Sequence, residues 1–236
     1  MADDFQTTRW SLVLAAGGGD GSRAAAALEQ LCMNAWRPLY AFARRSGRSP
    51  EDAEDLVQGF FASLIEGNGL ASVDRGRGRF RSFMLAAMKY HMADERNKRC
   101  AARRGGDAVH LPLDLEDAED SFLKSSPTEG FPDKDYDRDW THELLRRARA
   151  RLLSECESTA KYPICCELFP ERESPGEESY AEMANRLGMK ESTLRSTAFR
   201  LRRRWGELIR AEVAETVHSR ESFEQEMEAL KESLMG

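Results

Sequence analysis

A stretch near the end of the chain, from Ser179 to Trp205, carries side chains that are suited to contact a nucleic acid. It holds seven basic residues and two acidic ones, although the whole chain of 236 residues has a formal net charge of −6. Arginine can form paired hydrogen bonds with guanine or bind a phosphate, serine can meet either, and an apolar ring can contact a thymine methyl group. The composition of this stretch therefore indicates DNA binding.

The spacing within the same stretch predicts two helices joined by a short turn. Ser179 can cap the first helix, Gly188 and Lys190 fall in a turn, and a second helix begins near Glu191. One side of the second helix is apolar, with Leu194, Ala198, Leu201 and Trp205. The opposite side carries Arg195, Ser196, Phe199, Arg200 and Arg203. A solvated charged face usually mixes both signs, whereas residues 195–205 contain no acid, which favours a DNA-contacting face.

Composition predicts an all-α protein. Ala, Leu, Glu and Arg are common and Val and Ile are few. No run approaches the roughly 18 apolar residues of a membrane span, and the acidic first residues do not form a signal peptide. The five cysteines lack a repeated CxxC pattern, which favours reduced thiols. We therefore expect a cytoplasmic protein with no membrane span.

Charge and proline content predict how the chain is divided. Residues 107–139 contain eleven acids and three bases, together with Pro112, Pro127 and Pro132, and residues 212–236 contain seven acids and two bases. We expect two helical domains joined by a linker and followed by a tail. Their ranges are 1–104 for the first domain, 105–135 for an acidic flexible linker, 136–213 for a helix-turn-helix domain, and 214–236 for an acidic amphipathic tail.

Two helices of the first domain have clear signals. Ser49 and Pro50 predict the start of a helix whose inner face contains Ala53, Leu56, Val57, Phe60, Phe61 and Leu64. A glycine-arginine loop then precedes a long helix from about Phe80 to Arg103, which ends in a basic run. In the tail, the spacing of Phe223, Met227, Leu230 and Leu234 predicts one amphipathic helix.

Three segments resemble, in the same order, parts of bacterial sigma factors of the sigma-70 family. DAEDLVQGFF (Asp52–Phe61) is similar to the polymerase-docking helix of the extracytoplasmic-function group. GRFRSFMLAAMKYHMADERNKR (Gly78–Arg99) resembles the helix that melts and reads the −10 promoter element, and SYAEMANRLGMKESTLRSTAFRLRRR resembles the −35-reading helix-turn-helix. The additional N-terminal and C-terminal segments resemble those of an expanded planctomycete-type subgroup.

The resemblance implies roles for individual residues. Those that would face polymerase are Asp52, Glu54, Asp55 and Gln58. Those that would meet the −10 element are Arg77, Arg79, Phe80, Phe83, Lys89, Tyr90, Arg96 and Arg99. Those that would read the −35 element are Thr193, Arg195, Ser196, Phe199, Arg200 and Arg203. Phe83 and Tyr90 fit equally well as core residues.

The expected partners are core RNA polymerase and promoter DNA, and an anti-sigma protein is left open. We expect no cofactor and no enzymatic activity, because catalysis would belong to the polymerase. One alternative is a helix-turn-helix DNA-binding regulator that does not dock on polymerase. A metal protein is a second alternative, but the spacing of Cys156, Cys165, Cys166 and His142 fits no usual zinc pattern, so no metal is expected.

Overall fold

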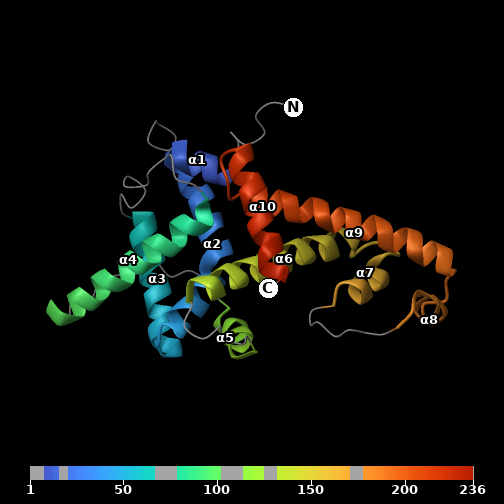
Figure 1. Cartoon of the computed structure of the whole chain (residues 1–236), viewed down its shortest axis with the longest axis horizontal. Coiled ribbons are helices and arrows are strands. Elements are labelled where there is room, and N and C mark those ends of the chain that lie inside the picture. Colours follow the sequence, from blue (N-terminus) through green and yellow to red (C-terminus); the bar gives the residue numbers. More distant parts are fainter. Residues whose placement is uncertain are drawn as a thin grey trace. The chain divides into compact units, whose positions relative to one another are not determined.

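The computed structural model of the protein describes residues 8–15, 21–66, 79–101, 114–124, 132–170 and 178–235. Within these residues all regular structure is α-helical, which confirms the predicted fold class (Figure 1). The helices are α1 (Arg9–Ala15), α2 (Gly21–Arg45), α3 (Pro50–Glu66), α4 (Phe80–Ala101), α5 (Leu115–Lys124), α6 (Pro132–Cys156), α7 (Tyr162–Leu168), α8 (Tyr180–Arg186), α9 (Glu191–Ala214) and α10 (Arg220–Met235).

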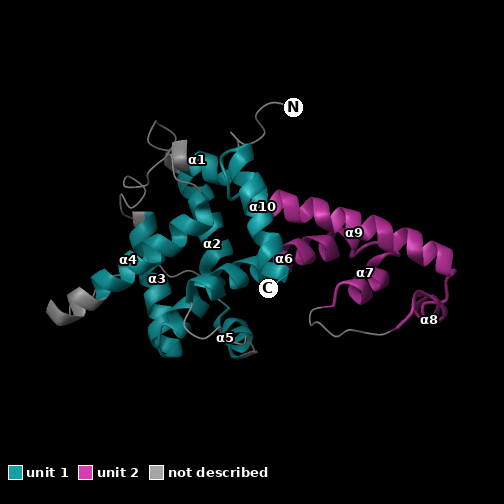
Figure 2. Cartoon of the chain, in the orientation of Figure 1, with its two compact units in different colours: residues 1–143, 213–236 teal, residues 144–212 magenta. Residues whose placement is uncertain are grey.

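The helices form two compact units (Figure 2). Unit 1 comprises Met1–Glu143 and Val213–Gly236, and unit 2 comprises Leu144–Glu212. The divisions fall inside α6 and inside α9, which differs from the domain limits expected from the sequence. The reason is that the linker, the start of α6 and the tail all contribute side chains to unit 1.

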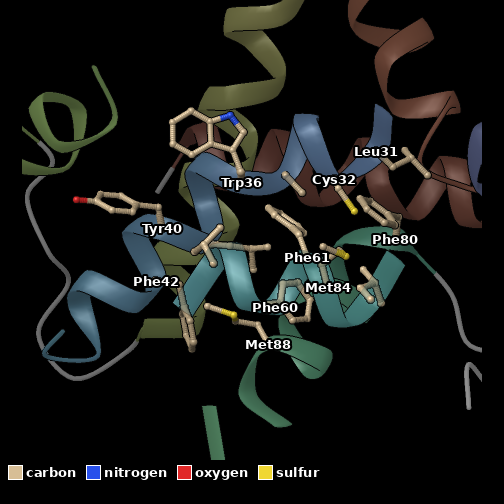
Figure 3. Close-up of a cluster of buried hydrophobic side chains, with 14 of the residues drawn as sticks. Leu31, Cys32, Trp36, Tyr40, Phe42, Phe60, Phe61, Phe80, Met84 and Met88 are labelled. Atoms are coloured by element: carbon tan, nitrogen blue, oxygen red, sulfur yellow. The ribbon is translucent and has the colours of Figure 1, made fainter. Parts of the chain in front are cut away.

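Unit 1 has an apolar core shared by α2, α3 and α4 (Figure 3). Gly47, with a φ of 85°, follows α2, and the Ser49 hydroxyl then accepts a hydrogen bond of 3.1 Å from the amide of Asp52 at the start of α3. The inner face predicted for α3 is confirmed. Its buried residues are Ala53, Leu56, Val57, Phe60, Phe61 and Leu64. Phe80, Met84 and Met88 of α4 complete the core at a spacing of four residues.

Helix α5 lies within the stretch that we expected to be a flexible linker. Its Ala118 is buried in the core of unit 1. Glu119 accepts hydrogen bonds from the Tyr40 hydroxyl at 2.6 Å and from Arg44 at 2.7 and 2.9 Å, and the Arg44 guanidinium lies 4.8 Å from the Phe122 ring. The acidic residues that indicated a solvated linker are thus partly used as partners for arginines of α2.

The first turns of α6 also belong to unit 1. Tyr136 and Trp140 are buried there, and their rings lie 6.2 Å apart. Arg45 at the end of α2 pairs with Asp139 and lies 3.6 Å from Asp135. We expected Tyr136, Asp139 and Trp140 in the second domain, because a helix period alone does not show which core a helix faces.

The C-terminal segment returns to unit 1 through backbone hydrogen bonds. The amide of Trp10 donates to the carbonyl of Glu215 at 3.1 Å, and the amide of Phe80 donates to the carbonyl of Thr216 at 3.0 Å. On α10 the buried side chains are Ser222, Glu226 and Leu230. Of the expected apolar stripe, Leu230 is buried, Phe223 and Met227 are half-buried, and Leu234 is exposed.

Unit 2 has its own core. It contains Ala148, Leu152 and Cys156 of α6, Ile164 and Cys165 of α7, Phe169, Ala184 of α8, and Leu194, Leu201 and Leu208 of α9. Arg147 and Arg151 of α6 bind the buried Glu212 carboxylate at 3.1 and 2.7 Å. Unit 2 is thus formed by the second part of α6 and most of α9, with the short helices α7 and α8 packed against them.

We predict that Glu119→Gln releases α5 from α2. Hydrogen bonding from Arg44 lowers the pKa of Glu119 below its ordinary value of 4.5, so the ionised carboxylate stabilises the attachment. That stabilisation is present above pH 4.5 and is lost as the pH falls through the lower pKa of the folded state. The substitution should cost about 1.5 kcal/mol, the low end for hydrogen bonds to a charged group.

Hydrogen exchange of residues 115–124 measures this attachment. Exchange should rise in Glu119→Gln at neutral pH, and in the wild-type protein below pH 4.5. Glu116→Gln is the matched control, because Glu116 is exposed on the same helix. Equal exchange of residues 115–124 in the two variants would contradict the role of Glu119 in attaching α5 to α2.

Candidate nucleic-acid interface

Helices α8 and α9 are joined by a short turn with defined ends. The Ser179 hydroxyl and the Glu182 side chain form a reciprocal cap: the Ser179 amide donates to Glu182 at 2.8 Å, and the Glu182 amide donates to the Ser179 hydroxyl at 3.3 Å. Gly188 has a φ of 65°, a conformation that favours glycine, and the amide of Met189 donates to the carbonyl of Ala184 at 2.9 Å. Local sequence therefore fixes where α8 starts and where the chain turns into α9.

The two sides of α9 differ as predicted from the spacing. Leu194, Ala198, Leu201 and Leu208 are buried, and Trp205 packs on Phe169 with ring centroids 5.1 Å apart. The residues expected to read DNA are exposed: Thr193, Arg195, Ser196, Phe199, Arg200 and Arg203. Phe199 is 69% exposed, so its ring is accessible to a partner.

The ring of Tyr180 on α8 lies close to two arginines of α9. The Arg195 and Arg202 guanidinium carbons lie 5.0 and 5.7 Å from the centre of its ring, and Arg202 also donates to the Tyr180 hydroxyl. Arg195 makes a second contact of 2.6 Å with Glu191. The sequence analysis gave Tyr180 no role, because its position near these arginines depends on how α8 packs.

Arg203 and Arg204 have different roles despite being neighbours. Arg204 binds the Glu155 carboxylate through two hydrogen bonds of 2.7 and 2.8 Å, and this hydrogen bonding lowers the pKa of Glu155. Arg204 therefore braces α9 against α6. Arg203 is more exposed and lies 3.3 Å from Glu207 one turn along the same helix. Arg203 is consequently the better candidate for a phosphate contact.

The start of α4 does not present all the residues that we expected at the −10 element. Phe80 is completely buried, with its ring 5.2 Å from Trp10 and 5.9 Å from Trp140. The expectation that Phe80 meets a DNA base is therefore wrong for this structure, because tryptophans of α1 and α6 pack against the buried ring. Phe83 is half-buried, 5.3 Å from Trp10.

The middle of α4 presents an exposed pair. Tyr90 is 79% exposed, and neighbouring Lys89 is also exposed and forms an ion pair of 2.6 Å with Asp133. An exposed ring beside a cation suits stacking on an unpaired base. Arg77 lies outside the described residues, and Arg96 and Arg99 lie on α4 with side chains that are not described. Arg79 lies 3.3 Å from Glu226 of α10.

Helix α3 carries the acids expected to face polymerase. Asp55 is exposed, and Asp52 and Glu54 are partly exposed. Gln58 is buried, so it faces the core rather than a partner, which corrects that part of the prediction. Sequence reasoning missed the acids of α5 that join this surface. They help line an open hollow of about 720 Å³ formed by Tyr40, Pro50, Glu51, Glu54, Asp114, Leu115, Glu116, Asp117, Glu119 and Asp120.

The thiols considered as metal ligands are parts of a core. Cys156 and Cys165 are buried in unit 2, and burial raises the pKa of Cys165 to about 12. Among the described residues, no three His, Cys, Asp or Glu side chains gather as candidate metal ligands. Among the same residues, none of the helices combines the length and apolar character that a membrane crossing requires.

Comparison with known families bears directly on unit 1. Residues 34–101 match the model of the family described as Sigma-70 region 2. The match supports a sigma factor of the sigma-70 family. It covers the second part of α2 together with all of α3 and α4, which are the helices that share the core of unit 1. Comparisons with curated proteins and with solved structures found no match.

The residues that match the family include exposed side chains of unit 1. The acids of α3 and the exposed Tyr90 lie within the matched residues. The match does not reach α8 and α9. What α9 offers for DNA contact is its exposed arginine, serine and phenylalanine side chains.

We predict that Tyr180 positions Arg195 for DNA contact. Tyr180→Leu should weaken duplex binding about two- to fivefold, the effect of losing a cation–π contact of about 0.5–1 kcal/mol at an exposed site. Tyr180→Phe keeps the ring and should lose less. Fluorescence anisotropy with a labelled duplex at fixed salt measures the affinity, and Tyr162→Leu on α7 serves as the control. Unchanged binding by a folded Tyr180→Leu protein would refute the role.

Proposed function

We propose that this protein is an extracytoplasmic-function-type sigma factor, which binds core RNA polymerase and directs transcription initiation at specific promoters in the cytoplasm. The observation that carries the proposal is the sigma-70 region 2 match in a chain that also has a separate helical unit with an exposed arginine face. In this proposal the protein has no catalytic site of its own, because phosphodiester formation belongs to the polymerase.

Unit 1 would supply polymerase docking. The exposed Asp55, together with Asp52 and Glu54, fits a basic partner surface, and the acid-lined hollow beside Glu54 extends this surface onto α5. Complementary charge speeds encounter and opposes wrong partners. Gln58 is left out of this surface because it is buried.

Unit 1 would also meet the −10 element. Tyr90 and Lys89 are the candidates for contact with an unpaired base and its phosphate, on the basis of their exposure. Phe83 is half-buried against Trp10 and would support α4 rather than stack on a base.

Unit 2 would read the −35 element with the first turns of α9. Arg200 donates to the carbonyl of Ser196 and the hydroxyl of Thr197, at 3.3 and 3.4 Å. Both acceptors are uncharged. To contact DNA, Arg195 would instead have to leave the Glu191 carboxylate or share it. Arg200 is therefore the first candidate for paired hydrogen bonds with a guanine. Thr193, Ser196, Phe199 and Arg203 lie on the same exposed side.

We predict that Asp55→Lys weakens capture of core polymerase at least about tenfold, because opposed like charges at an interface cost more than 1.4 kcal/mol. Asp55 is exposed, so the substitution should leave the fold intact. Glu224→Lys makes the same charge change on an exposed position of α10 and is the control. Pull-down with purified core enzyme is the measurement. A wild-type protein that binds DNA but fails to capture polymerase would favour the alternative, a DNA-binding regulator.

We predict that Arg200→Ala relaxes the preference at one base of the −35 element. The cost should be roughly 1–3 kcal/mol at the preferred base if Arg200 pairs with a guanine. In vitro transcription from a promoter library with core polymerase measures this preference. The control is Arg210→Ala, which removes an equal charge from a later, exposed turn of α9. If Arg195→Ala and Arg200→Ala both retain the wild-type preference and affinity, α9 does not read the element.

A further inference from the structure

Two arginines at the start of α4 surround a carboxylate from the C-terminal helix. Arg79 immediately precedes α4, and Arg81 is its second residue. A terminal nitrogen of Arg79 lies 3.3 Å from one oxygen of Glu226, and Nε of Arg81 lies 3.1 Å from the other. Glu226 is only 3% exposed. The helix start and the two guanidinium groups therefore form a buried site that already holds an anion.

Helix α6 supports this site independently of α10. Arg81 forms an ion pair of 3.2 Å with Asp137, and its carbonyl accepts a hydrogen bond of 3.2 Å from the buried Tyr136 hydroxyl. Arg81 is therefore oriented from α6 as well as from Glu226. With Asp137 as its remaining carboxylate, the site would carry a net positive charge if α10 moved away.

Burial of the Glu226 carboxylate gives its contact with Arg79 and Arg81 a desolvation cost. Desolvation is the main influence on this group and raises the pKa of Glu226 above its ordinary value, although Arg81 and Arg79 act in the opposite direction. Within the described part of the chain, the oxygen nearest Arg79 accepts no hydrogen bond of good geometry. Desolvation of a buried ion pair can exceed its attraction, so this contact is easier to exchange than its burial suggests.

The connection to α10 would allow the helix to move while its anchor stays. Thr216 and Val217 accept hydrogen bonds from the Phe80 amide and the Thr8 hydroxyl, at 3.0 and 2.7 Å. Residues 217–219 are not helical, and α10 starts at Arg220. Because its buried residues are only Ser222, Glu226 and Leu230 among the described residues, α10 buries little apolar surface compared with α3.

We propose that Arg79 and Arg81 form a binding site for a backbone phosphate of promoter DNA, and that Glu226 occupies this site in the free protein. The inference rests on the proposed function, because the phosphate would belong to the −10 region that α4 faces. A single phosphate would not bind the two arginines much more tightly than the Glu226 carboxylate does. DNA that is held at other points of the protein presents its phosphate at a high effective concentration and displaces α10.

Hydrogen exchange of the wild-type, full-length protein tests the displacement. The probe is a labelled single-stranded oligothymidine of about 20 nucleotides, longer than one single-strand binding site. Bound probe should increase exchange of residues 220–235 and leave the Phe80 amide protected. Unchanged or slower exchange of residues 220–235 with the probe bound overturns the proposal, and so does a probe that fails to bind.

Substitutions test the competition. Glu226→Gln should bind the probe about fivefold more tightly or better, as expected when a competing group is removed. Glu228→Gln, an equal charge change at an exposed position of the same helix, should stay close to wild type. Arg79→Ala should abolish the gain from Glu226→Gln. Equal affinities of the two glutamine variants, with thermal unfolding showing both folded, would make Glu226 a structural brace only.

Measuring the capture of core polymerase distinguishes a failure of the phosphate site from a failure of the proposed function. Both glutamine variants should capture core polymerase as the wild-type protein does. If the wild-type protein captures no polymerase, the proposed function fails, whereas the oligonucleotide experiments still report on the site. If capture is normal and the probe neither loosens α10 nor distinguishes Glu226→Gln from Glu228→Gln, only the phosphate site fails.

Discussion

Burial of the Phe80 ring is the constraint on which the arrangement of unit 1 depends. The ring contacts Trp10 before α2 and Trp140 on α6, and the Phe80 amide is bonded to the carbonyl of Thr216. Segments from the beginning, middle and end of the chain therefore meet at the first residue of α4. Because α4 begins at this junction, the packing there also determines where Lys89 and Tyr90 lie further along the helix.

The distribution of acids explains how an acidic chain can keep a basic surface. In unit 1, acids of α5, α6 and α10 neutralise arginines: Glu119 binds Arg44, Asp139 binds Arg45, and Glu226 meets Arg79 and Arg81. On the exposed side of α9 the acids are fewer and stand one turn from their arginines, as Glu191 and Glu207 do. Exposed pairs of this kind contribute little stability, so they can be exchanged for contacts with a partner.

The sequence allowed prediction of features that depend on local periodicity and capping. The inner face of α3, the cap at Ser179 and the two sides of α9 all follow from residues within one or two turns of each other. Features that depend on distant contacts could not be predicted. Phe80 is buried by tryptophans far along the chain, α5 is attached to arginines of α2, and Glu226 turns inward toward arginines that precede it by more than a hundred residues.

The four tryptophans are divided between the two units in a way that is useful for spectroscopy. Trp10, Trp36 and Trp140 are buried in unit 1, whereas Trp205 belongs to unit 2 and is partly exposed beside Phe169. Intrinsic fluorescence from a protein that retains only Trp205 would report on unit 2 alone. Because Trp205 lies on the same helix as the exposed arginines, its emission offers a label-free optical signal for events at that helix.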